Sequence, residues 1–293
     1  MNIKEHFRKM RGILKNHGLK AVILIYLTKI PLFEKLTRFF FGRILIKTKI
    51  IGSVMYLDIF DKGLHRKLIL KGIREVEHVN QINGNIKPGM IGIELGANIG
   101  YFALIEARLV GEKGLIYCIE PEPNNVKLLK KNIAANKLGD RMKVFRYLVG
   151  DHNGMEKLYL SEFANVHSLS PSRGKEGFAE VPMVTLDNFI KQNNIPRVDF
   201  IRMDIEGYEA IAFKGMEGWF RSGPNLKIFM EFHPMYYQEW GWTFEKLLRY
   251  LELFGFKVRE ISKGREVLRD PTIEEILKMH SDNNGSQAFL EKI

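Results

Sequence analysis

The fold of this chain is decided by the stretch Met90-Ile-Gly-Ile-Glu-Leu-Gly-Ala-Asn-Ile-Gly-Tyr101. Its apolar positions Ile91, Ile93 and Leu95 predict a short buried strand that ends in a turn containing an acidic residue and glycines. Residues 99–110 then have the pattern of a helix. A strand that leads through glycines into a helix N-terminus lets the backbone approach a ligand closely. We interpret this stretch as part of a site for a nucleotide-containing cofactor.

The positive charge of the chain is concentrated at its N-terminus. The 293 residues carry a formal net charge of +11, and residues 1–50 hold twelve Lys and Arg against two Glu, so the remainder is nearly neutral. An apolar content of 45% and a charged content of 27% are ordinary for a globular protein with a full core. The single cysteine, Cys118, lies in an apolar run. It excludes a disulfide framework and a cysteine-based zinc site, and it fits a reducing compartment.

Two interpretations fit the basic segment 1–50. Its apolar run, residues 21–27, is too short to span a bilayer, and no small-residue cleavage site follows it. Bulky apolar residues between 32 and 41 then recur at roughly helical spacing among basic ones. Such helices either contact anionic lipid headgroups or pack on the main domain, which we favour slightly. We expect a cytoplasmic protein, peripheral at the inner face of the membrane under the first interpretation.

Strand and helix patterns alternate along the rest of the chain. Through residues 90–255 this alternation predicts parallel strands joined by right-handed crossovers. Only a loop with one short helix separates the last two predicted strands, which suits an antiparallel pair. We therefore predict an α/β fold whose mostly parallel sheet has seven strands and a closing antiparallel pair. The domain spans 51–293, with a first strand and helix in 51–89 and the core in 90–293.

Three long elements are predicted from periodicity alone. Apolar residues at helical spacing predict one helix over 64–82, and a second helix is expected from Tyr208 to about Gly218. Residues 143–149 are predicted to form one strand, the third of the parallel sheet.

Acidic side chains follow several of the predicted parallel strands where each strand ends. Because these carboxyl ends meet at one edge of an open α/β sheet, where ligands bind, the side chains should lie together. Carboxylates rarely crowd together without a partner, so a functional edge explains them better than stability. The residues at this edge are Glu94, Gly96, Asn98, Gly100, Glu120, Asp151, Asp204, Glu206, Glu209, Glu231 and His233.

Glu120 and the glycine spacing together indicate the kind of cofactor. Glu120 lies 20 residues after Gly100, at the end of the second strand, where an acid can accept hydrogen bonds from both ribose hydroxyls. The turn Gly96-Ala-Asn-Ile-Gly100 has Asn98 where the dinucleotide fingerprint has the glycine that admits a pyrophosphate. S-adenosylmethionine, which has no phosphates, fits this loop better than NAD.

Four motifs in this order resemble the FkbM family of S-adenosylmethionine-dependent methyltransferases. They are Glu94-Leu-Gly-Ala-Asn-Ile-Gly-Tyr-Phe102, Glu120-Pro-Glu-Pro-Asn124, Val184-Thr-Leu-Asp187 and Val198-Asp-Phe-Ile-Arg-Met-Asp-Ile-Glu-Gly-Tyr-Glu209. The resemblance runs from about Met55 to Pro234. It implies a class I methyltransferase fold, which is Rossmann-like, and O-methylation, often of sugar hydroxyls in glycolipids, polysaccharides or natural products.

The resemblance also implies roles for individual residues. Glu120 would hold the ribose, Asp151 would lie near the adenine, and the turn from Glu94 to Gly100 would line the methionine end of the cofactor. The family usually has Asp where Glu94 stands and Lys where Arg202 stands. The implied cofactor-binding residues are Glu94, Gly96, Ala97, Asn98, Gly100, Glu120, Pro121, Asn124, Asp151 and Asp204.

Methyl transfer to a sugar hydroxyl is an in-line displacement that depends on positioning and benefits from a base. Asp204, Glu206 and His233 are the candidate catalytic residues, and their spacing does not rank them. His167, in a polar loop, either touches the acceptor or is exposed to solvent. Three clustered acids could also hold a divalent ion, but we expect no metal.

Two other functions are compatible with parts of the sequence. The basic N-terminus fits a nucleic-acid methyltransferase. However, the fourth strand lacks the Asn/Asp-Pro-Pro-aromatic ending of base amino-group methylation, and Cys118 offers no accessible nucleophile, which leaves ribose methylation. A non-catalytic adapter held at membranes by residues 1–50 is the other alternative. The intact Gly96, Gly100 and Glu120 argue against a loss of cofactor binding.

Overall fold

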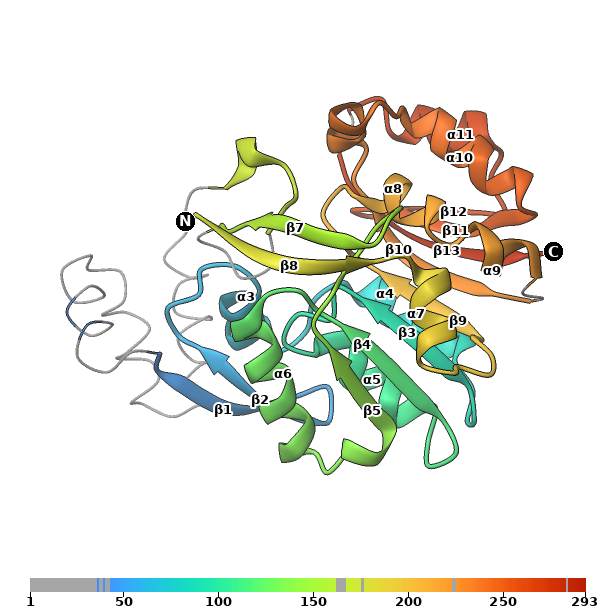
Figure 1. The fold of residues 1–293 in the computed structure, drawn as a ribbon. Coiled ribbons are helices and arrows are strands. Elements are labelled where there is room, and N and C mark those ends of the chain that lie inside the picture. The colour runs from blue at the N-terminus through green and yellow to red at the C-terminus, as the bar shows by residue number, and fades with distance from the viewer. Residues whose placement is uncertain are drawn as a thin grey trace.

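A computed structural model describes residues 43–161, 167–174, 177–222, 225–282 and 284–293, together with Leu36 and Phe39. An eight-stranded sheet forms the centre of this part of the chain (Figure 1). Its strands, in spatial order, are β12 (Glu266–Arg269), β11 (Phe256–Lys263), β13 (Ser286–Lys292), β10 (Lys227–Phe232), β9 (Phe200–Met203), β3 (Ile91–Leu95), β4 (Leu115–Ile119) and β5 (Met142–Phe145).

The sheet is parallel through its centre and antiparallel at one side. β5, β4, β3, β9 and β10 pair in parallel, and β13 pairs antiparallel with both β10 and β11. The predicted α/β fold with a largely parallel sheet and a closing antiparallel pair is thereby confirmed. The sheet has eight strands, however, and not the predicted seven. The additional strand, β12, forms because Gly264, with a φ of 64°, allows a tight turn in which Lys263 pairs with Glu266.

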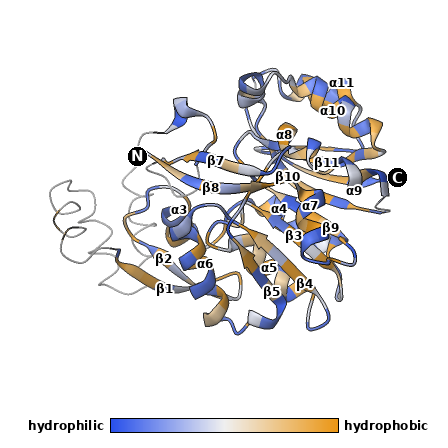
Figure 2. Cartoon of the chain, in the orientation of Figure 1, coloured by the Kyte–Doolittle hydropathy of each residue, from blue (hydrophilic) through white to orange (hydrophobic). Residues whose placement is uncertain are grey.

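Helices cover both faces of the main sheet, and the central strands between them are largely hydrophobic (Figure 2). Neighbouring residues of β9 divide between the two faces, since Phe200 packs in one hydrophobic cluster and Ile201 in the other. One face carries α3 (Leu64–Lys71), α4 (Val76–Asn85), α5 (Tyr101–Leu109) and α6 (Pro123–Ala135). The other carries α7 (Leu186–Gln192), α8 (Glu209–Lys214), α9 (Glu217–Ser222), α10 (Phe244–Leu253) and α11 (Ile273–Met279).

Each of the three long predicted elements is divided in two. The helix expected over 64–82 is α3 followed by α4, because Gly72 and Glu75 between them have left-handed φ values of 72° and 51°. The strand expected over 143–149 is β5 of the main sheet followed by β6 (Leu148–Val149) of another sheet. The helix expected from residue 208 is α8 followed by α9.

Two smaller sheets flank the main one. β6, β8 (Phe178–Val184) and β7 (Gly154–Tyr159) form a three-stranded sheet. β1 (Leu45–Ile50) and β2 (Ser53–Asp58) form an antiparallel pair. The 3-10 helices are η1 (Gly139–Arg141), η2 (Pro171–Arg173) and η3 (Pro234–Trp240).

The end of the segment 1–50 is a strand and not a helix. Residues 45–50 pair as β1 with β2, because Ile51 and Gly52 adopt the positive φ values of 43° and 76° that a tight hairpin turn requires. Apart from these strand residues and Leu36, Phe39, Arg43 and Ile44, the segment lies outside the described residues, so its amphipathic character and membrane contact remain predictions. Among the helices that are described, none is both long and apolar enough to cross a bilayer.

Candidate active site

The chain turns sharply where β3 ends, between the ends of β4 and β9. Gly96 has a φ of 77°, and a Cβ placed on it would lie 2.1 Å from the carbonyl oxygen of Asp204. The N–H groups of Gly96 and Ala97 both donate to the carbonyl oxygen of Ile119, at 3.0 and 3.1 Å. Only glycine combines this backbone conformation with so close an approach to the neighbouring strand. The turn predicted to bind a cofactor is therefore fixed by contacts on both sides.

Glu120 lies directly after β4 and holds the same turn from the other side. Its Oε2 accepts a hydrogen bond of 2.7 Å from the backbone N–H of Asn98. Its Oε1 accepts one of 3.0 Å from the N–H of Glu122 and one of 3.3 Å from the side-chain amide of Asn125. Burial raises the pKa of Glu120 to about 7, although these N–H groups favour the ionised form. The carboxylate is thus oriented before any ligand arrives.

A cavity of about 650 Å³ opens at the carboxyl ends of β3, β4 and β9. The three-stranded sheet closes it from the other side with residues of β6 and β7. The cavity is lined by Leu95, Gly96, Asn98, Ile119, Glu120, Pro121, Asn125, Tyr147, Leu148, Val149, Leu158, His167, Ser168, Leu169, Asp204, Ile205, Glu206 and Tyr208.

A second cavity, of about 400 Å³, adjoins the first and shares Gly96, Asn98 and Asp204 with it. Cations line it as well as acids, since Arg74 and Arg202 both reach it. Its other lining residues are Leu64, Glu94, Ala97, Tyr101 and Phe102. The two cavities therefore adjoin each other at the Gly96 turn.

Most of the predicted cofactor-binding residues line these two cavities, but three do not. Gly100 precedes α5 with a φ of 92°, and a Cβ there would lie 2.7 Å from Leu129. Asn124 donates its side-chain amide to Glu122, whereas the adjacent Asn125 reaches Glu120 and the larger cavity. Asp151 pairs with His152 near the surface, 2.9 Å away. The structure therefore does not bring Gly100, Asn124 or Asp151 to the cavities, and their roles remain predictions.

A buried ion pair supports the floor of the smaller cavity. Arg202 lies on β9 beside Glu94 on β3, and its Nη1 donates to Glu94 at 3.0 Å. Its Nη2 donates to Asp204 at 3.3 Å, and its guanidinium lies 4.0 Å from the centre of the Phe102 ring. Burial and the nearby Glu106 raise the pKa of Glu94 well above its usual range, against the effect of Arg202. The arginine at this position thus connects two predicted site residues as a permanent cation.

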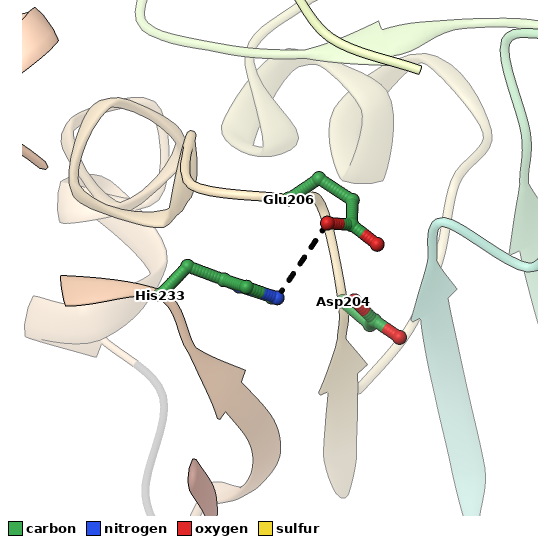
Figure 3. Close-up of side chains that lie close together, drawn as sticks. All are labelled: Asp204, Glu206 and His233. Atoms are coloured by element: carbon green, nitrogen blue, oxygen red, sulfur yellow. Dashed lines mark ion pairs between the residues drawn. The ribbon is translucent and has the colours of Figure 1, made fainter. Parts of the chain in front are cut away.

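Asp204 and Glu206, after the end of β9, line the larger cavity, and His233, after the end of β10, lies close to both (Figure 3). One ligand atom from each of them lies within 4.8 Å of the others. The Nε2 of His233 lies 3.7 Å from Glu206 and 3.9 Å from Glu231. Its Nδ1 is 2.9 Å from the Oε1 of Glu209, a residue with no exposed surface. The structure therefore brings together all three residues predicted to be catalytic.

Burial and mutual repulsion keep protons in this cluster. Burial and the carboxylate of Asp204 together raise the pKa of Glu206 to about 8 and that of Glu231 to about 7, against the effect of His233. Burial would lower the pKa of His233, but Glu209, Glu231 and Glu206 raise it well above its usual range. Burial would raise the pKa of Asp204, but Arg202 and His233 lower it. The cluster is a site where protons can be exchanged near neutral pH.

Several cavity residues were not identified from the sequence. Arg74 lies between α3 and α4, where the predicted helix was continuous, so no motif indicated it. Asn125 stands next to the selected Asn124, and the direction of the first turn of α6 would have distinguished them. His167 differs from these two, because the sequence already named it as either an acceptor contact or a solvent-exposed residue. It lines the larger cavity and accepts a hydrogen bond of 3.1 Å from the N–H of Ser161. This position agrees with contact to a ligand rather than with a freely solvated side chain.

The fold and the site define a class of enzyme. A parallel sheet with a glycine turn after its first strand, an acid after its second and acids after its fourth is the arrangement of a class I methyltransferase. The sequence model described as "Methyltransferase FkbM domain" matches residues 94–258, more than half of the chain. The chain belongs to the FkbM methyltransferase family, and S-adenosylmethionine is its methyl donor. The resemblance found in the sequence is thereby confirmed.

Three known proteins with similar sequence or structure share little sequence identity with this chain. The hexuronic acid methyltransferase AglP of Haloferax volcanii is 22% identical over 185 residues, which are 59% of this chain and 72% of AglP. A SAM-dependent methyltransferase from Aquifex aeolicus has a TM-score of 0.43 at 13% identity, covering 74% of this chain and 89% of its own. TYW2 of M. jannaschii, solved in complex with AdoMet, has a TM-score of 0.43 at 16% identity, covering 85% and 87%.

Proposed function

We propose that this methyltransferase acts on a hydroxyl group of a sugar, in a glycolipid, a polysaccharide or a related metabolite. The observation that carries the proposal is the convergence of Asp204, Glu206 and His233 beside the cavity, which Asp204 and Glu206 line. A hydroxyl is a poor nucleophile until its proton is removed, and this cluster holds groups that can accept one. The name of the relative AglP, a hexuronic acid methyltransferase, supports a sugar as the acceptor.

The charge of the site supports a hydroxyl rather than a carboxylate as the methylated group. A hexuronic acid offers both groups. Here the rim of the cavity is formed by Asp204 and Glu206, with Glu231 close behind them. The ionised Asp204 would repel an acceptor carboxylate, whereas a neutral hydroxyl can donate a hydrogen bond to Asp204.

The residues around the cavity have separate tasks in this proposal. S-adenosylmethionine supplies a methyl group carried on a sulfonium, and the acceptor hydroxyl gives up one proton. The pre-oriented carboxylate of Glu120 accepts a ribose hydroxyl, and the close contact of Gly96 with Asp204 holds the turn that lines the cavity. Asp204 and Glu206 orient the acceptor oxygen, and its proton passes to the cluster. The apolar side chains Leu148 and Leu158 exclude water from the cavity, which strengthens these polar contacts.

The proposal is tested by transfer of labelled methyl groups from S-adenosylmethionine into a cell-envelope extract. We expect the label in a carbohydrate fraction, as a methyl ether that survives mild alkali. A methyl ester would be released by alkali and would contradict the preference for a hydroxyl. Label found in nucleic acid would contradict the acceptor class altogether.

Asp204→Asn links this activity to the cluster. Loss of a group that positions the acceptor and favours proton removal should lower turnover about a hundredfold while cofactor affinity changes little. Asp140→Asn, at an exposed position in η1, is the matched control. An unchanged rate in Asp204→Asn, measured with the same extract, would remove Asp204 from the proposed mechanism.

A further inference from the structure

The cluster at the rim of the cavity contains a histidine nitrogen without a hydrogen-bond partner. The side chain of His233 is only 8% exposed, and its Nε2 makes no hydrogen bond with any described residue. This nitrogen points toward Glu206, with Asp204 beside it (Figure 3). The Oδ1 of Asp204 is also buried without a hydrogen-bond partner. The Nε2 of His233 therefore has only the ion-pair contacts with Glu206 and Glu231, at 3.7 and 3.9 Å, and the Oδ1 of Asp204 has no hydrogen-bond partner, so both atoms are available to a further group.

From this geometry we propose that Asp204, Glu206 and His233 bind a divalent metal ion of the Mn²⁺ type. The sequence placed Asp204, Glu206 and His233 at one edge of the sheet, but it led us to expect no metal there. The structure adds a nitrogen donor to two carboxylates. That donor set suits first-row transition metals better than Mg²⁺ or Ca²⁺, which prefer oxygen donors alone.

The distances fit a metal ion after small side-chain adjustments. An ion about 2.1 Å from each donor holds its donors roughly 3 to 4.2 Å apart, depending on whether they are adjacent or opposite. Glu206 and His233 are 3.7 Å apart, and the three donor atoms all lie within 4.8 Å of one another. Glu231, 3.9 Å from the same nitrogen, can supply a fourth donor.

Glu209 completes the arrangement from behind. The buried Oε1 of Glu209 lies 2.9 Å from the Nδ1 of His233. Metal-binding histidines typically donate their other ring N–H to a carboxylate, which fixes the tautomer and directs the free nitrogen at the ion. Glu209 itself is held by the N–H of Gly207 at 3.0 Å. The contact between Glu209 and His233 is therefore pre-organised, and it orients the ring of His233 as a metal-binding histidine requires.

A second histidine, His152, also lies beside two carboxylates, but its geometry does not fit a metal site. His152 contacts Asp151 through Nδ1 at 2.9 Å and Glu156 through Nε2 at 3.1 Å. Both of its nitrogens are occupied by separate carboxylates, and its side chain is 52% exposed. His152 and its two acids therefore form a surface ion-pair group and serve as the matched control.

The metal site does not depend on the identity of the acceptor, but its role in the reaction rests on the proposed function. An ion at this point would lie beside the acceptor hydroxyl and lower the pKa of that hydroxyl as a Lewis acid. The carboxylates of Asp204 and Glu206 would then orient the ion rather than receive the proton themselves.

The test is titration of the full chain with Mn²⁺ alone, followed by calorimetry and electron paramagnetic resonance. We expect one bound ion per chain and a nitrogen coupling from a histidine ring in the spin-echo spectrum. His233→Asn keeps a donor for Glu209 but removes Nε2, and should abolish the nitrogen coupling. Glu209→Gln should weaken Mn²⁺ binding about tenfold to a hundredfold. His152→Ala should change neither the affinity nor the spectrum.

Each outcome decides between the occupants of this site. A proton held on Nε2, in place of a metal, would give no binding of Mn²⁺ and would overturn the proposal. Binding that persists in both His233→Asn and Glu206→Gln would place the ion elsewhere and overturn it too. Labelled methyl transfer that proceeds fully with a chelator refutes the metal role and leaves the proposed function intact. Mn²⁺ bound with its histidine coupling, but no transfer to a carbohydrate, refutes the function and leaves the metal site.

Discussion

Replacement of Glu120 by glutamine tests the central feature of the cofactor site. The carboxylate already accepts hydrogen bonds from Asn98, Glu122 and Asn125, so about one of its four lone-pair sites is left for a ligand in the cavity that Glu120 lines. An amide can offer only one acceptor atom and would turn a donor toward either a backbone N–H or the ribose. The loss of a hydrogen bond to a charged group costs about 2 kcal/mol. The dissociation constant for S-adenosylmethionine should therefore rise roughly thirtyfold.

The pH dependence of S-adenosylmethionine binding is a second measurable consequence of the role proposed for Glu120. Burial raises the pKa of Glu120 to about 7, and the ionised form is the better acceptor for a ribose hydroxyl. The carboxylate is therefore mostly ionised at pH 8 and mostly protonated at pH 6. Affinity for S-adenosylmethionine should fall about tenfold between these two values in the unmodified protein. Glu120→Gln cannot titrate, so its affinity should lack this component.

Titration calorimetry at several pH values checks both expectations, with thermal unfolding as a measure of the variant's integrity. Glu112→Gln, whose side chain is 89% exposed, is the control for removal of one carboxylate. If Glu120→Gln binds S-adenosylmethionine within threefold of the unmodified protein, or keeps the full pH dependence, the assignment of Glu120 to the ribose is wrong.

Two further predictions concern the support of the site. Gly96→Ala places a Cβ 2.1 Å from the carbonyl oxygen of Asp204 and should destabilise the protein by about 1–3 kcal/mol, measured by urea unfolding. Gly111→Ala, with a φ of 65° and no atom within 4 Å, isolates the cost of the backbone conformation, and an equal loss in both would refute the contact argument. Arg202→Met leaves both Glu94 and Asp204 without their cation and should cost about 3–5 kcal/mol, of which Glu94→Gln in the same chain should restore a part. No recovery in that double variant would show that the ion pair is not the source of the loss.

Local features of the sequence were sufficient for the main course of the fold. The alternation of strand and helix, the glycine turn after Leu95 and the distance to Glu120 are all properties of short stretches. They predicted the parallel sheet and the cofactor. They also predicted the edge at which the site lies, because the carboxyl ends of parallel strands lie at the same edge of the sheet. The local signals failed where one residue changed the backbone direction. Gly72 interrupts the helix expected over 64–82, and Gly264 creates a strand that periodicity did not indicate.

Only the tertiary structure decided which side chains meet. The sequence placed Asp204, Glu206 and His233 at one edge, but their convergence depends on the lateral pairing of β9 with β10. It also depends on the left-handed φ of 53° at Glu206, which the following Gly207 accommodates. The contact of Glu209 with His233 joins residues 24 positions apart and has no signature in the sequence. The sequence by itself therefore determined the methyl donor, because recognition of the donor is built from one strand, one turn and the next strand. The chemistry at the acceptor is built from side chains of different strands, whose directions only the packed sheet fixes.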